Sequence, residues 1–128
     1  AVAGQRLQAA QIECGHWSKV LDDYDSADTL AYLDPPYLHS TRNRRNRDSY
    51  DHEMTETDHA RLLLRLREYK GKVVLSGYAS SLYDELLSGW RRIEIETTSS
   101  ASNRANKKHA RRTEVLWLNY APPVADAA

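Results

Sequence analysis

Four consecutive residues, Asp34, Pro35, Pro36 and Tyr37, combine a carboxylate, a rigid backbone carbonyl and an aromatic ring. An amino group on a flat base is a poor nucleophile, because its lone pair is delocalised into the ring. Two acceptors on its N–H bonds draw the nitrogen toward a reactive tetrahedral shape, and the Asp34 carboxylate and the Pro35 carbonyl are candidates. Proline offers its carbonyl without a competing N–H, and Tyr37 can stack on the base. The four residues therefore predict a site for an exocyclic amino group on a base.

The segments around this motif favour a ligand-binding edge of a sheet. The apolar run 29–33 predicts a short buried strand, and open α/β sheets bind ligands at the carboxyl ends of their strands. A second predicted strand, 72–76, leads into the turn at Gly77 and Tyr78, so Tyr78 is a candidate contact for a cofactor or the base. Asp-Pro and Pro-Pro pairs also mark ordinary turns, and a plain turn is the alternative interpretation. The strand before the motif and the second strand–glycine turn favour the functional one.

The order of helix and strand patterns predicts an α/β fold. The expected elements are a short strand at 11–14, a helix at 17–24, a strand at 29–33, a helix at 56–70, a strand at 72–76, a helix that starts at Ser80 or Ser81, and strands at 92–98 and 113–120. Alternation of strands and helices predicts a mostly parallel sheet, whereas the last two strands, joined without a helix, form an antiparallel pair. Strands 29–33, 72–76 and 92–98 then end at one rim.

Several single residues are assigned to a helix end, the core or the surface. Thr55 and Asp58 are expected to form a capping box at the start of the helix 56–70. The tryptophans are interpreted as core residues: Trp17, Trp90 and Trp117. Three histidines are interpreted as surface residues, because they lack metal-like spacing with acids: His52, His59 and His109. No metal site is predicted.

Two predicted loops on the shared rim carry clusters of basic residues. The residues predicted to contact nucleic acid, besides Tyr37, are Arg42, Arg44, Arg45 and Arg47 in the first loop and Arg104, Lys107 and Lys108 in the second. Either cluster alone is typical of a solvated loop. Two clusters on one rim, beside a turn that binds a base, favour nucleic acid, because basic side chains neutralise phosphates.

Composition sets limits but does not select a partner. The chain has 128 residues, 41% of them hydrophobic, which predicts one folded domain or part of one. Basic and acidic residues balance at 18 each, so the net charge of the chain neither favours nor excludes a polyanionic partner. Cys14 is the only cysteine, which excludes an internal disulfide. There is no membrane-length apolar run and no signal-peptide pattern, and we expect a cytoplasmic protein.

The residues now described resemble the DNA adenine methylase family of DNA N6-adenine methyltransferases, especially its phage and prophage members. The segments that carry the resemblance are Ile12-Glu13, Leu33 to Tyr37, Asp58-His59, Gly71 to Tyr78, Trp90 and Arg112 to Tyr120. The family's catalytic Asp-Pro-Pro-Tyr motif falls on residues 34–37. The resemblance implies a Rossmann-like sheet, S-adenosylmethionine as methyl donor, and N6 of adenine in double-stranded DNA as acceptor. It also implies that Asp34 lies next to the donor.

The sequence departs from the family pattern in two ways. Its five glycines lie at 4, 15, 71, 77 and 89 and form no glycine-rich donor loop. The chain therefore resembles the carboxyl-terminal half of the family, without the first two strands of its sheet. His16 stands where the family usually has an acid that holds the donor's adenosine, so His16 is the candidate contact there. We expect weak donor binding, an exposed sheet edge that favours self-association, a catalytic part at 1–120 and a disordered tail at 121–128.

Two other functions stay open at this point. Related motifs also methylate amino groups on RNA bases, so an RNA methyltransferase is the nearest enzymatic alternative. The non-enzymatic alternative is an inactive prophage remnant, or a nucleic-acid-binding module, that kept the fold and lost the donor site.

Overall fold

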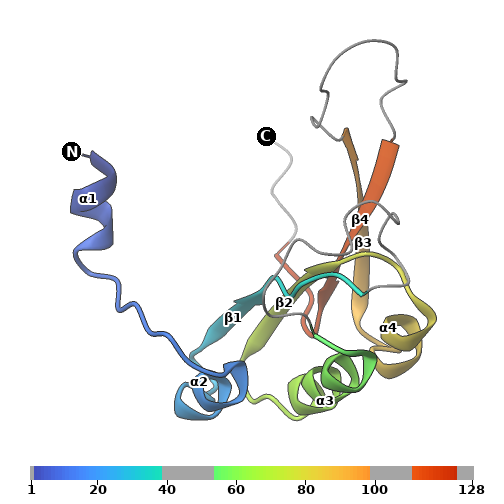
Figure 1. Cartoon of the computed structure of the whole chain (residues 1–128), viewed down its shortest axis with the longest axis horizontal. Helices are drawn as coiled ribbons and strands as arrows, with labels where there is room; N and C mark the ends of the chain where they lie inside the picture. The colour runs from blue at the N-terminus through green and yellow to red at the C-terminus, as the bar shows by residue number, and fades with distance from the viewer. Residues whose placement is uncertain (1, 39–53, 99–110, 124–128) are drawn as a thin grey trace.

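The computed structural model describes residues 2–38, 54–98 and 111–123. Its elements are the helices α1 (Val2–Leu7), α2 (Trp17–Asp23), α3 (Glu56–Arg67) and α4 (Ser81–Leu86) and the strands β1 (Leu30–Leu33), β2 (Lys72–Gly77), β3 (Arg91–Thr98) and β4 (Arg111–Leu118) (Figure 1). Helix α1 buries no residue and lies apart from the sheet (Figure 1). The site is therefore positioned by the elements from α2 onward.

The four strands form one mixed sheet in the order β1-β2-β4-β3. Only β1 and β2 pair in parallel, while β4 is antiparallel to both β2 and β3. The prediction of a mostly parallel sheet is wrong, because β4 inserts between β2 and β3 and separates two strands that run the same way. The antiparallel last pair is confirmed. Since β3 is antiparallel to β4, it still points in the direction of β1 and β2, and the three strands end toward the same rim.

The hydrophobic core lies on one face of this sheet. Alternate strand residues face it, among them Leu33, Leu75 and Trp117, and helices α2, α3 and α4 lie on that same side (Figure 1). Trp117 is 1% exposed, and Trp17 and Trp90 are partly buried against the cluster, in agreement with the predicted core roles. The turn after β1 is therefore anchored to a packed layer.

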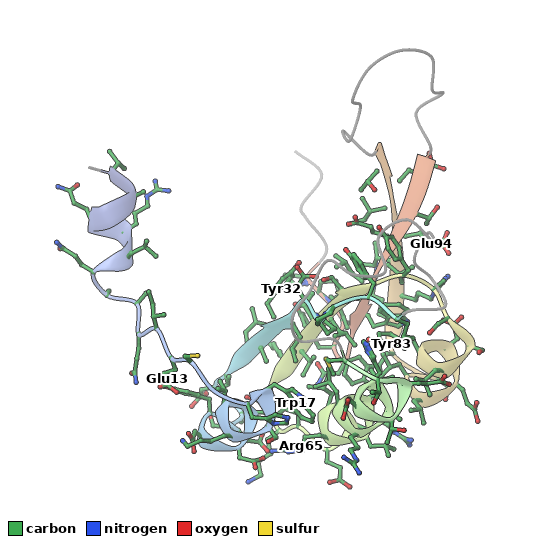
Figure 2. The ribbon with its side chains drawn as sticks, viewed as in Figure 1. Glu13, Trp17, Tyr32, Arg65, Tyr83 and Glu94 are labelled. Atoms are coloured by element: carbon green, nitrogen blue, oxygen red, sulfur yellow. The ribbon has the colours of Figure 1, made fainter. Side chains whose placement is uncertain are left out.

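Side-chain contacts fix where the helices begin and how they meet. Thr55 and Asp58 form the predicted capping box at α3, with the Asp58 N–H donating to Thr55 Oγ1 at 3.1 Å. Hydrogen bonds from Thr55 hold the pKa of the Asp58 carboxyl below its usual range. Arg65 joins α3 to the end of α2 and the turn beyond it, donating to Asp22 and Asp25 at 2.9 Å each (Figure 2). These contacts hold α2 and α3 side by side beneath β1.

Three predictions about single segments are wrong. The strand before Asp34 is not buried: Leu30 and Tyr32 of β1 are 59% and 66% exposed, because β1 is an edge strand and the helices cover only the other face of the sheet (Figure 1).

His59 is fully buried, with Nδ1 2.8 Å from the Tyr83 hydroxyl, rather than at the surface. It lies three and four residues before Leu62 and Leu63, so it continues the apolar face of α3. Residues 11–14 form no strand, and Ile12 is 85% exposed, because no described strand lies beside them to complete a ladder.

Candidate active site

The turn that follows β1 is held against the end of β2. The parallel register places Leu33 beside Leu75, so the next residues, Asp34 and Ser76, are neighbours. The Ser76 hydroxyl donates to Asp34 Oδ1 at 2.9 Å, with the Leu33 carbonyl oxygen 3.3 Å away. The carboxylate of Asp34 is thus fixed at the rim while remaining exposed to a ligand.

Tyr37, at the end of the motif, packs against Tyr78. The two ring centroids are 4.2 Å apart and the planes are inclined by 33°. Burial, followed by the negative charge of Glu114 and the neighbouring Tyr78 and Asp34, raises the pKa of Tyr37 to about 12. The phenol therefore stays neutral at physiological pH and presents an uncharged aromatic surface.

Glu114 is the residue of this group that the sequence did not single out as a site. It lies on β4 one residue before Val115, which pairs with Gly77 at the end of β2. Its charge acts on Tyr37, so β4 brings a second carboxylate to the neighbourhood of this ring. Glu114 lies in the last segment that carries the family resemblance. Nothing in the sequence of that segment marks Glu114 as a site residue rather than its neighbours.

A small pocket adjoins the motif on the helix side. Its volume is about 230 Å³, and the described residues that line it are Trp17, Leu33, Asp34, Pro35, Pro36, Met54 and Leu62. Of these, only Asp34 carries a charge. Ligand pockets commonly measure roughly 300–1,000 Å³, so this one has room for part of a ligand.

The sequence matches a model of a known protein family. The family model of D12 class N6 adenine-specific DNA methyltransferases matches residues 2–101. The chain belongs to this family. The resemblance inferred from the sequence is confirmed, and the matched range includes the turn 34–37 and the end of β2. A search of curated proteins returned no match.

The two other predicted cofactor contacts of this D12 methyltransferase have defined places. His16 caps α2: its Nδ1 accepts from the Ser18 N–H at 3.3 Å and lies 2.8 Å from the Ser18 hydroxyl. It is exposed and precedes Trp17, which lines the pocket, so a role with the donor stays a prediction. Tyr78 contacts Tyr37 at the end of the motif, and a role for Tyr78 with the cofactor or the base stays a prediction.

The predicted basic contacts of the D12 chain lie outside the described residues. They are Arg42, Arg44, Arg45, Arg47, Arg104, Lys107 and Lys108, and His52 and His109 lie outside as well. The described flanks of both segments are at the rim. Leu38 follows Tyr37 in the core and Met54 lines the pocket. Residues 111–114 of β4 pair with β3 alone and extend about 13 Å beyond β2, at roughly 3.3 Å a residue (Figure 1).

The described part of the D12 chain holds neither a metal-binding cluster nor a membrane-spanning helix. No group of three or more histidine, cysteine, aspartate or glutamate side chains in residues 2–38, 54–98 and 111–123 could hold a metal ion. Within the same ranges, every helix is too short or too polar to cross a membrane.

Proposed function

We propose that this chain forms the adenine-binding part of an enzyme that transfers a methyl group from S-adenosylmethionine to N6 of adenine in double-stranded DNA. The observation that supports this most strongly is the Asp34 carboxylate held by Ser76 beside the stacked rings of Tyr37 and Tyr78. Family membership supports a DNA adenine methyltransferase. We propose that residues 1–120 act as the catalytic part, with 121–128 as a tail outside it, in the cytoplasm of a bacterial or phage-infected cell.

The proposed chemistry needs positioning and charge, without a protein nucleophile. The two N–H groups of the adenine amino group donate hydrogen bonds to the Asp34 carboxylate and the Pro35 carbonyl, which localises the nitrogen lone pair for direct transfer. Pro36 fixes the turn, and Tyr37 stacks on the base once it has left the helix. Positive charge that develops on nitrogen is stabilised by a carboxylate that is already in place.

The described residues are better suited to bind adenine, the methyl acceptor, than S-adenosylmethionine, the methyl donor. S-adenosylmethionine, when bound, supplies the methyl group. The pocket beside Asp34 has a volume of about 230 Å³ and only this one charged residue among its described lining, so it lacks partners for the charged amino-acid end of the donor. The absence of a glycine cluster from the sequence has the same consequence.

Calorimetric titration tests the donor side. Titrating S-adenosylmethionine into the chain is expected to give a dissociation constant weaker than about 1 mM, or less than about 4 kcal/mol of binding free energy. The physical reason is the small, nearly apolar pocket. S-adenosylhomocysteine serves as the control, because it lacks the sulfonium charge but keeps the same amino-acid end. Micromolar binding of either compound would contradict the proposal of an incomplete donor site.

Methyl transfer distinguishes the proposed function from its two alternatives. With S-adenosylmethionine supplied at millimolar concentration, mass spectrometry is expected to find N6-methyladenine in duplex DNA and none in RNA of the same sequence. Methylation confined to RNA would support the RNA methyltransferase. Binding of DNA without any transfer, even after prolonged incubation, would support the inactive remnant or binding module.

The basic residues at 42–47 and 104–108 are proposed to contact the phosphates of the DNA. Their support is the position of the flanking residues: Leu38 and Met54 adjoin the turn, and β3 and β4 project beyond the rim. Contacts of this kind carry no sequence information by themselves and make affinity depend on salt.

Self-association through β1 is proposed from the exposure of that strand. β1 is an edge of the sheet, its residues Leu30 to Leu33 include no charge or proline, and Leu30 and Tyr32 are 59% and 66% exposed. Tyr32 lies on the side of β1 away from α2 and α3 (Figure 2). Uncharged edges of this kind pair with other strands.

Light scattering during size-exclusion chromatography is expected to show a mass that rises with concentration. Tyr32→Lys should weaken association by at least about tenfold, because a lysine blocks edge pairing. Leu64→Lys, at a position 50% exposed on α3, is the matched control and should have no such effect. A monomer at every concentration would contradict the proposal.

A further inference from the structure

Ser76 is a buried polar residue in a strand whose other buried positions are apolar or glycine. It is 8% exposed, and its neighbours along β2 include the buried Val73 and Leu75. A buried hydroxyl is unfavourable unless it is hydrogen-bonded, and a valine would suit the strand equally well. Its acceptors are Asp34 Oδ1 at 2.9 Å and the Leu33 carbonyl oxygen at 3.3 Å. The shorter bond, to the charged acceptor, compensates for the burial of this hydroxyl and accounts for a serine at this position of the strand.

Tyr78, two residues later on the chain, contacts Tyr37, just as Ser76 contacts Asp34. Its ring centroid is 4.2 Å from that of Tyr37, too close for a base to enter between them. One face of Tyr37 is therefore occupied, and an adenine can stack only on the opposite face. Ordering Tyr37 before the base arrives lowers the entropy lost on binding.

We propose that Ser76 and Tyr78 are positioning residues of the acceptor site. Ser76 holds the Asp34 carboxylate in the orientation that receives the amino group, and Tyr78 forms a second aromatic layer behind Tyr37. The end of β2 thus aligns both side chains of the turn that contact the base. This inference rests on the proposed function, and it assigns Tyr78 to the base rather than to the donor.

The experiment separates the two roles by using two probes. Both are DNA duplexes of one sequence with an unpaired base opposite an abasic site. One carries adenine there, and the other carries purine, which lacks the amino group. The ratio of the two affinities reports the contact of Asp34 with the amino group, whereas the affinity common to both reports stacking on Tyr37. The variants are Ser76→Ala and Ser76→Thr, and Tyr78→Ala and Tyr78→Phe.

Ser76→Ala is expected to lower the preference for adenine by about tenfold or more, the effect of a lost hydrogen bond to a charged group, and to leave purine binding unchanged. Tyr78→Ala is expected to weaken both duplexes alike, by about tenfold. Ser76→Thr keeps the hydroxyl and Tyr78→Phe keeps the ring, so both should resemble the wild type. Ser88→Ala and Tyr24→Ala, at exposed positions, are the matched controls.

A measurement without DNA tests the two positioning contacts separately from the proposed function. Three-bond Hα–Hβ couplings should show one χ1 rotamer for Asp34 and Tyr37 in the wild type. Ser76→Ala should average the coupling of Asp34 alone, and Tyr78→Ala that of Tyr37 alone. Unchanged couplings in the variants would overturn the positioning roles. So would an equal loss of affinity for the adenine and purine duplexes in every variant. Fixed couplings in a wild type that does not prefer adenine would instead contradict the proposed function.

Discussion

Replacing Asp34 by asparagine is expected to lower the single-turnover rate of methyl transfer by about 10²–10³-fold, the usual effect of removing one preorganised electrostatic contact. Asparagine keeps the shape of the side chain, so the turn and the Ser76 contact can form. It removes the charge that stabilises the developing positive nitrogen, and its amide can present a donor where the amino group needs an acceptor. The rate is measured on duplex DNA with S-adenosylmethionine at millimolar concentration.

Asp28→Asn is the matched control for this substitution. Asp28 is exposed in the loop before β1 and bears the same charge, so it tests whether net charge alone changes binding to DNA. Its rate should stay within about twofold of the wild type, as expected for a surface substitution. A rate for Asp34→Asn equal to that of this control would remove Asp34 from the reaction and, with it, the proposed role of the turn.

The local features of the fold could be predicted because they depend on neighbouring residues. The capping box of Thr55 and Asp58 follows from their spacing, and the strand before Asp34 follows from its apolar run. The order of strands could not be predicted in the same way. Whether β4 lies outside β3 or between β2 and β3 depends on contacts such as Trp117 with Tyr83, whose ring centroids are 4.9 Å apart.

The candidate site shows the same division. Asp34 and Tyr37 have chemistry that is visible in the sequence, whereas Ser76 and Glu114 gain importance only from the strands that bring them to the rim. His59 shows how periodicity could have been used further. Its position three residues before Leu62 fits the buried face of the helix, whereas the surface assignment rests only on the lack of metal-like spacing with acids. Residue type was informative for the chemistry, and spacing was more informative for burial.

Gly71→Ala is expected to lower the free energy of unfolding by about 3 kcal/mol, near the upper end for overpacking. A Cβ on Gly71 would lie 2.4 Å from the Thr29 carbonyl oxygen and 2.6 Å from that of Ser26. Both contacts are backbone, which cannot rotate away as a flexible side chain can. The adjacent Lys72 N–H donates to the same Thr29 oxygen at 2.9 Å, so relief of the clash must disturb the start of the β1–β2 pair. Urea denaturation, followed by circular dichroism, measures the loss.

Two other glycines separate this steric effect from the conformational freedom of glycine. A Cβ on Gly15 would meet no atom within 4 Å, and Gly15→Ala should change stability by less than about 0.5 kcal/mol. Gly89 has equally open space but a φ of 89°, so Gly89→Ala should cost about 1–2 kcal/mol from backbone strain alone.

Gly71→Ala should lose more stability than either of these variants. Its amide signals should shift at Asp34 and Ser76, since the β1–β2 register aligns these two residues. A Gly71→Ala protein as stable as Gly15→Ala would mean that the Ser26–Thr29 turn does not abut the start of β2. The alignment of Asp34 with Ser76 would then need another cause.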